Sequence, residues 1–310
     1  MRVLVTGALG YVGGRLCESL RSLGHTVIAS ARSVPPPAQA WAEQFELRLA
    51  DVLRDDLDEL VRDVEAVVHL ASLDEREAER SPGEALLVSG EGTRRLLEAA
   101  ARAHVRRTIF FSTFHVYGPS APPRIDEHTA TYAAHPYAIA HQAGEGFCLQ
   151  AALRGQSAVC VRLSNGYGAP SWVDVDRWSL AHNDFCRQAV RHGKIVLRSP
   201  GTQQRDFVAL EDVAAAVSIL LEADIDPRLP IYNVGGNCSL SIYELAIRVA
   251  ESARRLRGAD CPIERPEPHA SSTAPVDFRI DRMQNLGYQP KDQIEPETSR
   301  LLRLLEGAEA

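Results

Sequence analysis

The chain has 310 residues, of which 45% are hydrophobic and 24% charged, and its net charge is −7. This balance is typical of a globular protein and excludes a disordered or collagen-like chain, and the acidic charge argues against general nucleic-acid binding. No window approaches about 18 continuous apolar residues, and the first residues lack the apolar core of a secretory signal, so we expect neither a membrane span nor export.

The first half of the chain alternates apolar runs with helical segments. The runs expected to be strands are 3–6, 26–31, 47–49, 66–71, 108–112 and 158–163. The segments expected to be helices are 13–23, 93–103 and 136–153. The run 66–71 is apolar throughout, as in a strand that helices cover on both faces. The alternation predicts an α/β fold, a Rossmann-type doubly wound parallel sheet.

The second half is less regular. Helices are expected at 178–192, 212–223, 241–257 and 299–305, and strands at 195–197, 206–210 and 231–234. Residues 261–276 contain four prolines and are expected to form a loop.

The six cysteines form no C-x-x-C pair and have no zinc-like spacing with histidine. We therefore expect no metal site, and reduced thiols in a cytoplasmic protein.

A glycine-rich turn, 6–13 (TGALGYVG), joins the first strand to the first helix. Gly7 permits a tight turn, Gly10 lets the backbone approach a pyrophosphate, and Gly13 lets the helix pack on the strand. The helix N-terminus would offer N–H groups to the anion. In this context the pattern predicts a dinucleotide site, the alternative being an incidental turn.

The TGxxGxxG form resembles the short-chain dehydrogenase/reductase superfamily, in particular its extended branch of nucleotide-sugar epimerases, dehydratases and ketoreductases. Other segments match that branch in order, over roughly residues 3–290. They are 51–52 (DV), 69–72 (HLAS), 112–118 (STFHVYG), 136–137 (PY), 162–168 (RLSNGYG), 205–208 (RDFV), 212–214 (DVA) and 232–235 (YNVG).

The resemblance implies a cofactor cleft and a substrate site made from these segments. The cofactor residues would be Gly7, Leu9, Gly10, Tyr11, Val12, Gly13, Arg32, Asp51, Val52, Leu70, Ala71, Ser72, Ser89, Ser112, Tyr137, His141 and Leu163. His115, Asn165 and Arg205 would bind a nucleotide-sugar substrate. Residues 1–165, with segments near 205–222, would form the NAD(P)-binding domain, and residues 166–310 a smaller α/β substrate-binding region.

The segment 27–33 (VIASARS) bears on the choice of cofactor. NAD-binding members hold the ribose 2′-OH with an acidic residue in this region, and none is present. Arg32 could instead pair with a 2′-phosphate, which favours NADP over NAD. Alternatively, Arg32 stacks on the adenine or points to solvent.

By resemblance, Tyr137 carries the proton and Thr113 hydrogen-bonds the substrate oxygen. The family places a lysine four residues after the tyrosine, one helical turn on, but this chain has His141. Histidine is mostly neutral at pH 7, so it should lower the pKa of Tyr137 less than lysine does. His141 could still hydrogen-bond a ribose hydroxyl, with His115 or His135 assisting. A second departure is Ser89, which stands where the family has asparagine.

Two reactions fit this pattern, a 4-epimerisation with retained NAD and a 4-keto reduction by NADPH. The residues after Thr113 are Phe114 and His115 rather than an acidic pair, which disfavours 4,6-dehydration. The alternative to an enzyme is a catalytically impaired dinucleotide-binding protein, a sensor or scaffold. A homodimer is also expected, through helices at 91–103 and 137–153 whose alanine-rich faces could equally pack on the sheet.

Overall fold

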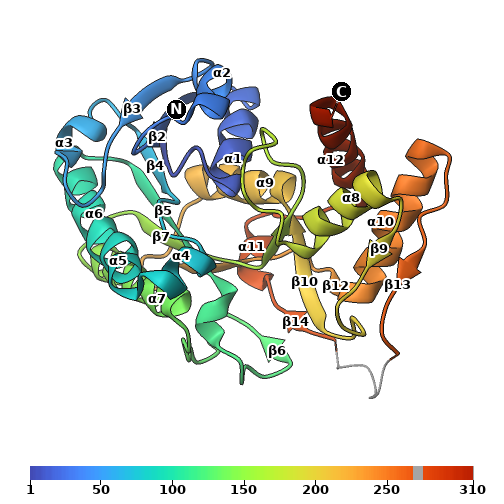
Figure 1. Ribbon diagram of the computed structural model, residues 1–310. Coiled ribbons are helices and arrows are strands. Elements are labelled where there is room, and N and C mark those ends of the chain that lie inside the picture. Colours follow the sequence, from blue (N-terminus) through green and yellow to red (C-terminus); the bar gives the residue numbers. More distant parts are fainter. Residues whose placement is uncertain (268–274, 310) are drawn as a thin grey trace.

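The computed structural model describes residues 1–267 and 275–309. Its largest sheet has seven parallel strands in the order β11-β7-β5-β4-β1-β2-β3 (Figure 1). These strands are β1 (Arg2–Thr6), β2 (Thr26–Ala31), β3 (Glu46–Leu49), β4 (Ala66–His69), β5 (Arg107–Thr113), β7 (Ala158–Leu163) and β11 (Ile231–Val234). The doubly wound parallel sheet expected from the sequence is confirmed.

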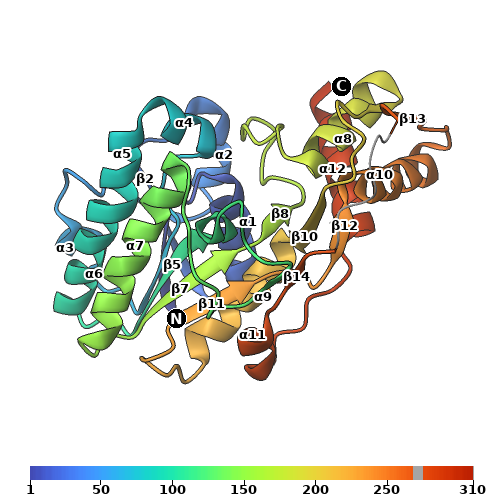
Figure 2. The same ribbon diagram turned by 90° about the horizontal axis from the view of Figure 1, so that it is seen from below.

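Helices cover both faces of this sheet (Figure 2). On one face lie α3 (Leu57–Leu60), α6 (Thr93–Arg102) and α7 (Pro136–Leu153), and on the other α1 (Tyr11–Ser22), α9 (Leu210–Glu222) and α11 (Asp281–Asn285). Successive strand residues point to opposite faces, so in β1 Leu4 packs with the first set, whereas Val3 and Val5 pack with the second. This explains why the strand sequences are apolar throughout.

A smaller part lies beside the carboxyl ends of these strands. Its sheet contains β8 (Asn165–Tyr167), β10 (Gln204–Ala209) and β12 (Ser239–Ser241), in the order β12-β10-β8. Helices α8 (Ala181–His192), α10 (Ile242–Arg257) and α12 (Ile294–Glu309) share a second apolar core with it. Two short strand pairs are β9 (Ile195–Val196) with β13 (Ile263–Glu264), and β6 (Arg124–Ile125) with β14 (Asp277–Phe278).

The remaining elements surround the carboxyl edge and the first turns. They are η1 (Pro36–Ala38), α2 (Gln39–Ala42), α4 (Glu75–Arg80), α5 (Pro82–Leu86), the π-helix η2 (Leu87–Gly92) and η3 (Phe114–Tyr117). Among the described residues, no helix is both long and apolar enough to cross a membrane.

Several boundaries differ from the expectation. The last helix begins at Ile294 rather than 299, because Pro296 falls in the first turn, where its missing N–H costs nothing. The helix expected from 178 begins at Ala181, since Leu180 is extended. The expected loop 261–276 contains β13 and lies partly outside the described residues.

The strand order reverses next to β1, because β2 and β3 follow on one side while β4 lies on the other. Ligands of open α/β sheets bind at such a switch point, outside the carboxyl ends of the strands. The residues expected to bind cofactor lie along this edge or in the turns that follow it.

Candidate active site

The glycine turn lies at the switch point of the sheet. Gly7 has a φ of +68°, and a Cβ there would lie 2.8 Å from the carbonyl carbon of Leu70, which follows β4. A Cβ on Gly13 would lie 2.2 Å from the Gly7 oxygen, so no larger residue fits. Gly10 caps α1 without a side-chain hydrogen bond, which leaves the first-turn N–H groups for an anion. This is the backbone form of a pyrophosphate site.

A buried chain of hydrogen bonds holds the neighbouring strand end in place. Thr93 donates its hydroxyl to the Ser89 carbonyl (2.6 Å), so it accepts from His69 Nε2 (3.1 Å). His69 Nδ1 then accepts from the Thr6 hydroxyl (2.6 Å), and Thr6 in turn accepts from the N–H groups of Leu70 and Ala71. Burial lowers the pKa of His69 to about 3, so the ring is neutral and structural.

The residues expected at the adenine end lie together beyond β2 and β3. Arg32 is largely exposed, and its guanidinium lies 4.0 Å from the carboxylate of Glu84 on α5. The Asp51 carboxylate accepts the N–H of Leu53 (2.8 Å). Val52 is buried against η2.

The other expected cofactor residues divide between the edge of the cleft and the core. Leu9 and Val12 are partly buried against the main core, Ser72 is exposed, and Leu163 ends β7. The Tyr11 side chain points away from the turn and donates its hydroxyl to the Gly168 carbonyl (2.6 Å), so only its backbone N–H faces the anion space.

A buried ion pair joins α1 to the C-terminal helix. Arg15 makes two hydrogen bonds to the Glu297 carboxylate, at 2.7 and 2.9 Å, and one to the Ala169 carbonyl at 2.7 Å. Glu297 also accepts the Ala169 N–H at 2.9 Å. The pair fixes α12 and the start of the 169–180 loop against the helix that opens the dinucleotide cleft.

The catalytic segment brings Tyr137 beside the end of β5. Tyr137 is in the first turn of α7, and Thr113, the last residue of β5, is close enough for its side chain to lower the pKa of the Tyr137 phenol. His115 and His135 lie within 6.2 Å of the tyrosine ring, centroid to centroid, and 5.2 Å from each other. Burial and the nearby His135 lower the pKa of His115 to about 4, so His115 is neutral at pH 7.

His141 lies against Tyr137 with 4.4 Å between ring centroids. Its Nδ1 donates to the Phe111 carbonyl at 3.1 Å, because a carbonyl can only accept. Burial lowers the pKa of His141 to about 4, so at neutral pH its Nε2 carries no hydrogen and can only accept a hydrogen bond. That Nε2 is buried and has no hydrogen-bond partner.

The charges nearest Tyr137 come from an ion-pair cluster that the sequence did not single out. Arg177, in the loop before α8, pairs with Asp74 at 3.2 Å and with Glu75 at 3.4 Å. Burial and the charge of Glu75 raise the pKa of Tyr137, whereas Arg177 and the Thr113 side chain lower it. Tyr137 is therefore a protonated phenol at neutral pH.

A second buried network lies behind the catalytic segment. The Ser112 hydroxyl donates to Glu145 at 2.6 Å, so its side chain is turned to the core. Arg162 makes two hydrogen bonds to the same carboxylate, at 2.9 and 2.8 Å, and stacks on Tyr117. Sequence reasoning missed Glu145, although it lies two helical turns after Tyr137 on the same face of α7.

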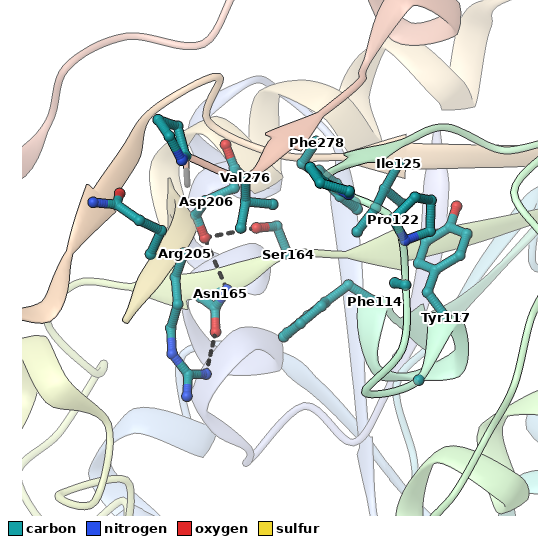
Figure 3. Close-up of a pocket in the computed structure, with 15 residues that line it drawn as sticks. Phe114, Tyr117, Pro122, Ile125, Ser164, Asn165, Arg205, Asp206, Val276 and Phe278 are labelled. Carbon is teal, nitrogen blue, oxygen red and sulfur yellow. Dashed lines mark hydrogen bonds between the residues drawn. The ribbon is translucent and has the colours of Figure 1, made fainter. Parts of the chain in front are cut away.

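A cavity of about 340 Å³ opens beside Phe114, the residue that follows Thr113 (Figure 3). Asn165 and Arg205 line one side of it, and Phe114, Ile125 and Phe278 line the other. Within the part of the chain that the structure describes, the Arg205 guanidinium hydrogen-bonds only to neutral oxygens, of Asn165 at 3.3 Å and Gln203 at 3.5 Å. A guanidinium without a carboxylate partner is a site for a ligand anion.

These features fit a nicotinamide dinucleotide. The glycine turn accepts a pyrophosphate, and the unpartnered Nε2 of His141 can accept a hydrogen bond from a ribose hydroxyl. Among the residues the structure describes, no group of three or more His, Cys, Asp or Glu side chains could hold a metal ion.

A family model described as "NAD dependent epimerase/dehydratase family" matches residues 3–235. The chain belongs to this family. The match includes the glycine turn, the residues around Thr113 and Tyr137, and strands β8 and β10, so the expectation of an extended short-chain dehydrogenase/reductase enzyme is confirmed.

Three known proteins illustrate the range of this family. The chain is 27% identical to a UDP-N-acetyl-alpha-D-glucosaminuronate decarboxylase of Bacillus cytotoxicus, over 88% of this chain and 87% of the relative. It is 29% identical to a UDP-glucose 4-epimerase of Mycolicibacterium smegmatis, over 94% of each. Its fold is similar to that of a UDP-glucuronic acid 4-epimerase from Bacillus cereus in complex with UDP-glucuronic acid and NAD (TM-score 0.80, 21% identity, 99% of this chain and 100% of that chain).

Proposed function

We propose that this enzyme epimerises a nucleotide-linked sugar with a retained NAD, and that Tyr137 carries the proton. The observation that carries the proposal is the position of Tyr137. It lies next to Thr113 at the carboxyl edge of the sheet, and the residue after Thr113, Phe114, lines the cavity that contains Arg205. A sugar whose diphosphate binds Arg205 would present its ring to Thr113 and Tyr137.

The chain's own residues would orient the sugar and move a proton. Thr113 would hold the reacting sugar oxygen, and Tyr137 in its phenolate form would take the proton from that oxygen and later return it. Bound NAD would supply a positive nicotinamide ring that accepts the hydride and gives it back to the other face of the sugar carbon. His141 would hold the ribose through Nε2 and supply no charge, because it is neutral.

NAD is the cofactor that the observations favour. The sequence favoured NADP because of Arg32, and this preference finds no support in the comparisons. A 2′-phosphate beside Arg32 would also meet the carboxylate of Glu84, 4.0 Å from the guanidinium. The family description and the NAD in the similar Bacillus cereus structure support NAD.

The substrate side rests on Arg205 and Asn165, which would bind the diphosphate. Asn165 is the last residue of the 1–165 stretch and Arg205 the first of the 205–222 segment, so both would lie at the border between the proposed cofactor domain and the substrate region. β11 belongs to the main sheet and α9 packs against it, although both come from the second half of the chain. The cofactor domain would therefore contain segments from both sides of residue 165.

A homodimer and a reducing, cytoplasmic setting are further parts of the proposal. The alanines expected at the dimer face, such as Ala99, Ala100 and Ala140, are buried in the protomer. The exposed side chains of Leu86, Leu87, Ile139 and Leu153 on α5, η2 and α7 support an interface through those helices. All six cysteines are unpaired.

The test is the cofactor content of the purified protein. We expect about one NAD per chain after denaturation, and loss of UDP-sugar epimerisation by at least about 100-fold in Tyr137→Phe with the NAD retained. A protein that is purified empty and reduces 4-keto nucleotide sugars with NADPH would be a ketoreductase. A protein that binds neither dinucleotide would be a non-catalytic member, and either result would overturn the proposal.

A further inference from the structure

We propose that the sugar end of this site takes an uncharged hexose and rejects a uronic acid, and that Phe114 sets this choice. The inference rests on the proposed function, because it concerns the substrate of the same site. It separates this chain from similar proteins named for glucuronic or glucosaminuronic acid derivatives.

Phe114 holds the decisive position. It directly follows Thr113 and opens η3, and its side chain points into the cavity toward Asn165 (Figure 3). Its ring packs against His115 with 4.2 Å between centroids. Any sugar that reaches Thr113 with its reacting oxygen would therefore place a neighbouring substituent against Phe114.

The wall that continues from Phe114 is apolar. Pro122, Ile125, Val276 and Phe278 line it, and the Tyr117 hydroxyl is turned away to Asn233 at 2.6 Å. A carboxylate on the sugar would lose its water against this wall and find no donor in return.

Among the described residues, the polar side of the cavity has no basic side chain beyond Arg205 that could pair with a sugar carboxylate. Arg205 is the one basic side chain among the described residues that line the cavity, and the diphosphate would occupy it. His115 is neutral at pH 7. Asp206 is a buried acid whose carboxylate accepts the N–H groups of Gly236 and Cys238, and its charge would repel a second carboxylate.

The test compares matched ligands on the full chain with its NAD. UDP and dTDP alone identify the preferred nucleotide, and the glucose and glucuronic acid forms of that nucleotide are then measured by calorimetry. We expect the glucuronic acid form to bind at least about 100-fold more weakly than the glucose form. We expect Phe114→Ser to reduce that gap at least tenfold, because a hydroxyl can donate to the carboxylate.

Two further variants separate specificity from folding. Phe114→Leu keeps an apolar side chain and should keep the wild-type gap, as should Leu229→Ser at an exposed position between α9 and β11. Equal binding of the two sugars by the wild type, or an unchanged gap in a folded Phe114→Ser, would overturn the inference and leave the proposed function intact. If neither nucleotide binds, the proposed function fails and the inference fails with it.

Discussion

His141 and Tyr137 lie face to edge with 4.4 Å between their ring centroids, and the histidine brings no positive charge to the tyrosine. Tyr137 acts as a base only as the phenolate, whose fraction grows with pH up to the pKa of the phenol, and burial raises that pKa. The rate of sugar oxidation should therefore keep rising with pH through the alkaline range.

His141→Lys should move this rise to lower pH, because an ammonium beside Tyr137 stabilises the phenolate. The measurement is the pH profile of kcat in single-turnover oxidation of the sugar. His141→Gln, which adds no charge, is the control and should leave the profile in place. An unshifted profile in a folded, NAD-loaded His141→Lys would show that Tyr137 is not the titrating base.

Two members of the ion-pair cluster of Arg177, Asp74 and Glu75 should shift the pKa of Tyr137 in opposite directions when they are replaced. Glu75→Gln removes a charge that raises the pKa of Tyr137, so the rise should move to lower pH. Arg177→Gln removes a charge that lowers it, so the rise should move to higher pH. Arg187→Gln, which breaks a pair with Asp184 on α8, should do neither. Shifts of the same sign in the first two variants would contradict this electrostatic account.

Gly13 should tolerate no side chain. A Cβ would lie 2.2 Å from the Gly7 oxygen, so Gly13→Ala should distort the glycine turn, lower stability by about 1–3 kcal/mol and abolish NAD retention. Gly146→Ala, on the exposed face of α7 with no atom within 4 Å of its Cβ, should instead raise stability by up to about 1 kcal/mol. Urea unfolding and NAD content measure both; full NAD content in Gly13→Ala would refute the pyrophosphate assignment.

The buried Arg15–Glu297 pair should be costly to break. Arg15→Met leaves the Glu297 carboxylate buried without its cation and should lower the free energy of unfolding by about 3–5 kcal/mol. Arg102→Met removes an exposed pair with Asp58 and should cost at most about 1 kcal/mol. The double change Arg15→Met with Glu297→Leu should recover part of the loss. Equal unfolding midpoints for the two single variants would argue against this role for the pair.

The strands, the glycine turn and α7 could be predicted from the sequence because their signals are local. Apolar runs mark buried parallel strands, and the 136–153 segment begins with proline and ends before a glycine. The short helices α4 and α5 could not, since six and five residues are too few to show a helical period and both helices depend on packing against α7.

The directions in which side chains point at the site could not be predicted from the sequence either. The motif suggested that Ser112 faces the cofactor, but Glu145, 33 residues away, takes its hydroxyl. The tautomer of His141 depends on its hydrogen bond to the Phe111 carbonyl, and its neutral charge depends on burial. The spacing of residues along the sequence predicts neither. Contacts of this kind join distant segments, so only the folded chain reveals them.

The ion pair between Arg15 and Glu297 has a consequence for folding during synthesis. The two residues are 282 positions apart, so a ribosome releases Arg15 long before the carboxylate that holds it. The helix that opens the dinucleotide cleft therefore lacks this partner until α12 has been synthesised. Cofactor capture should follow the synthesis of α12.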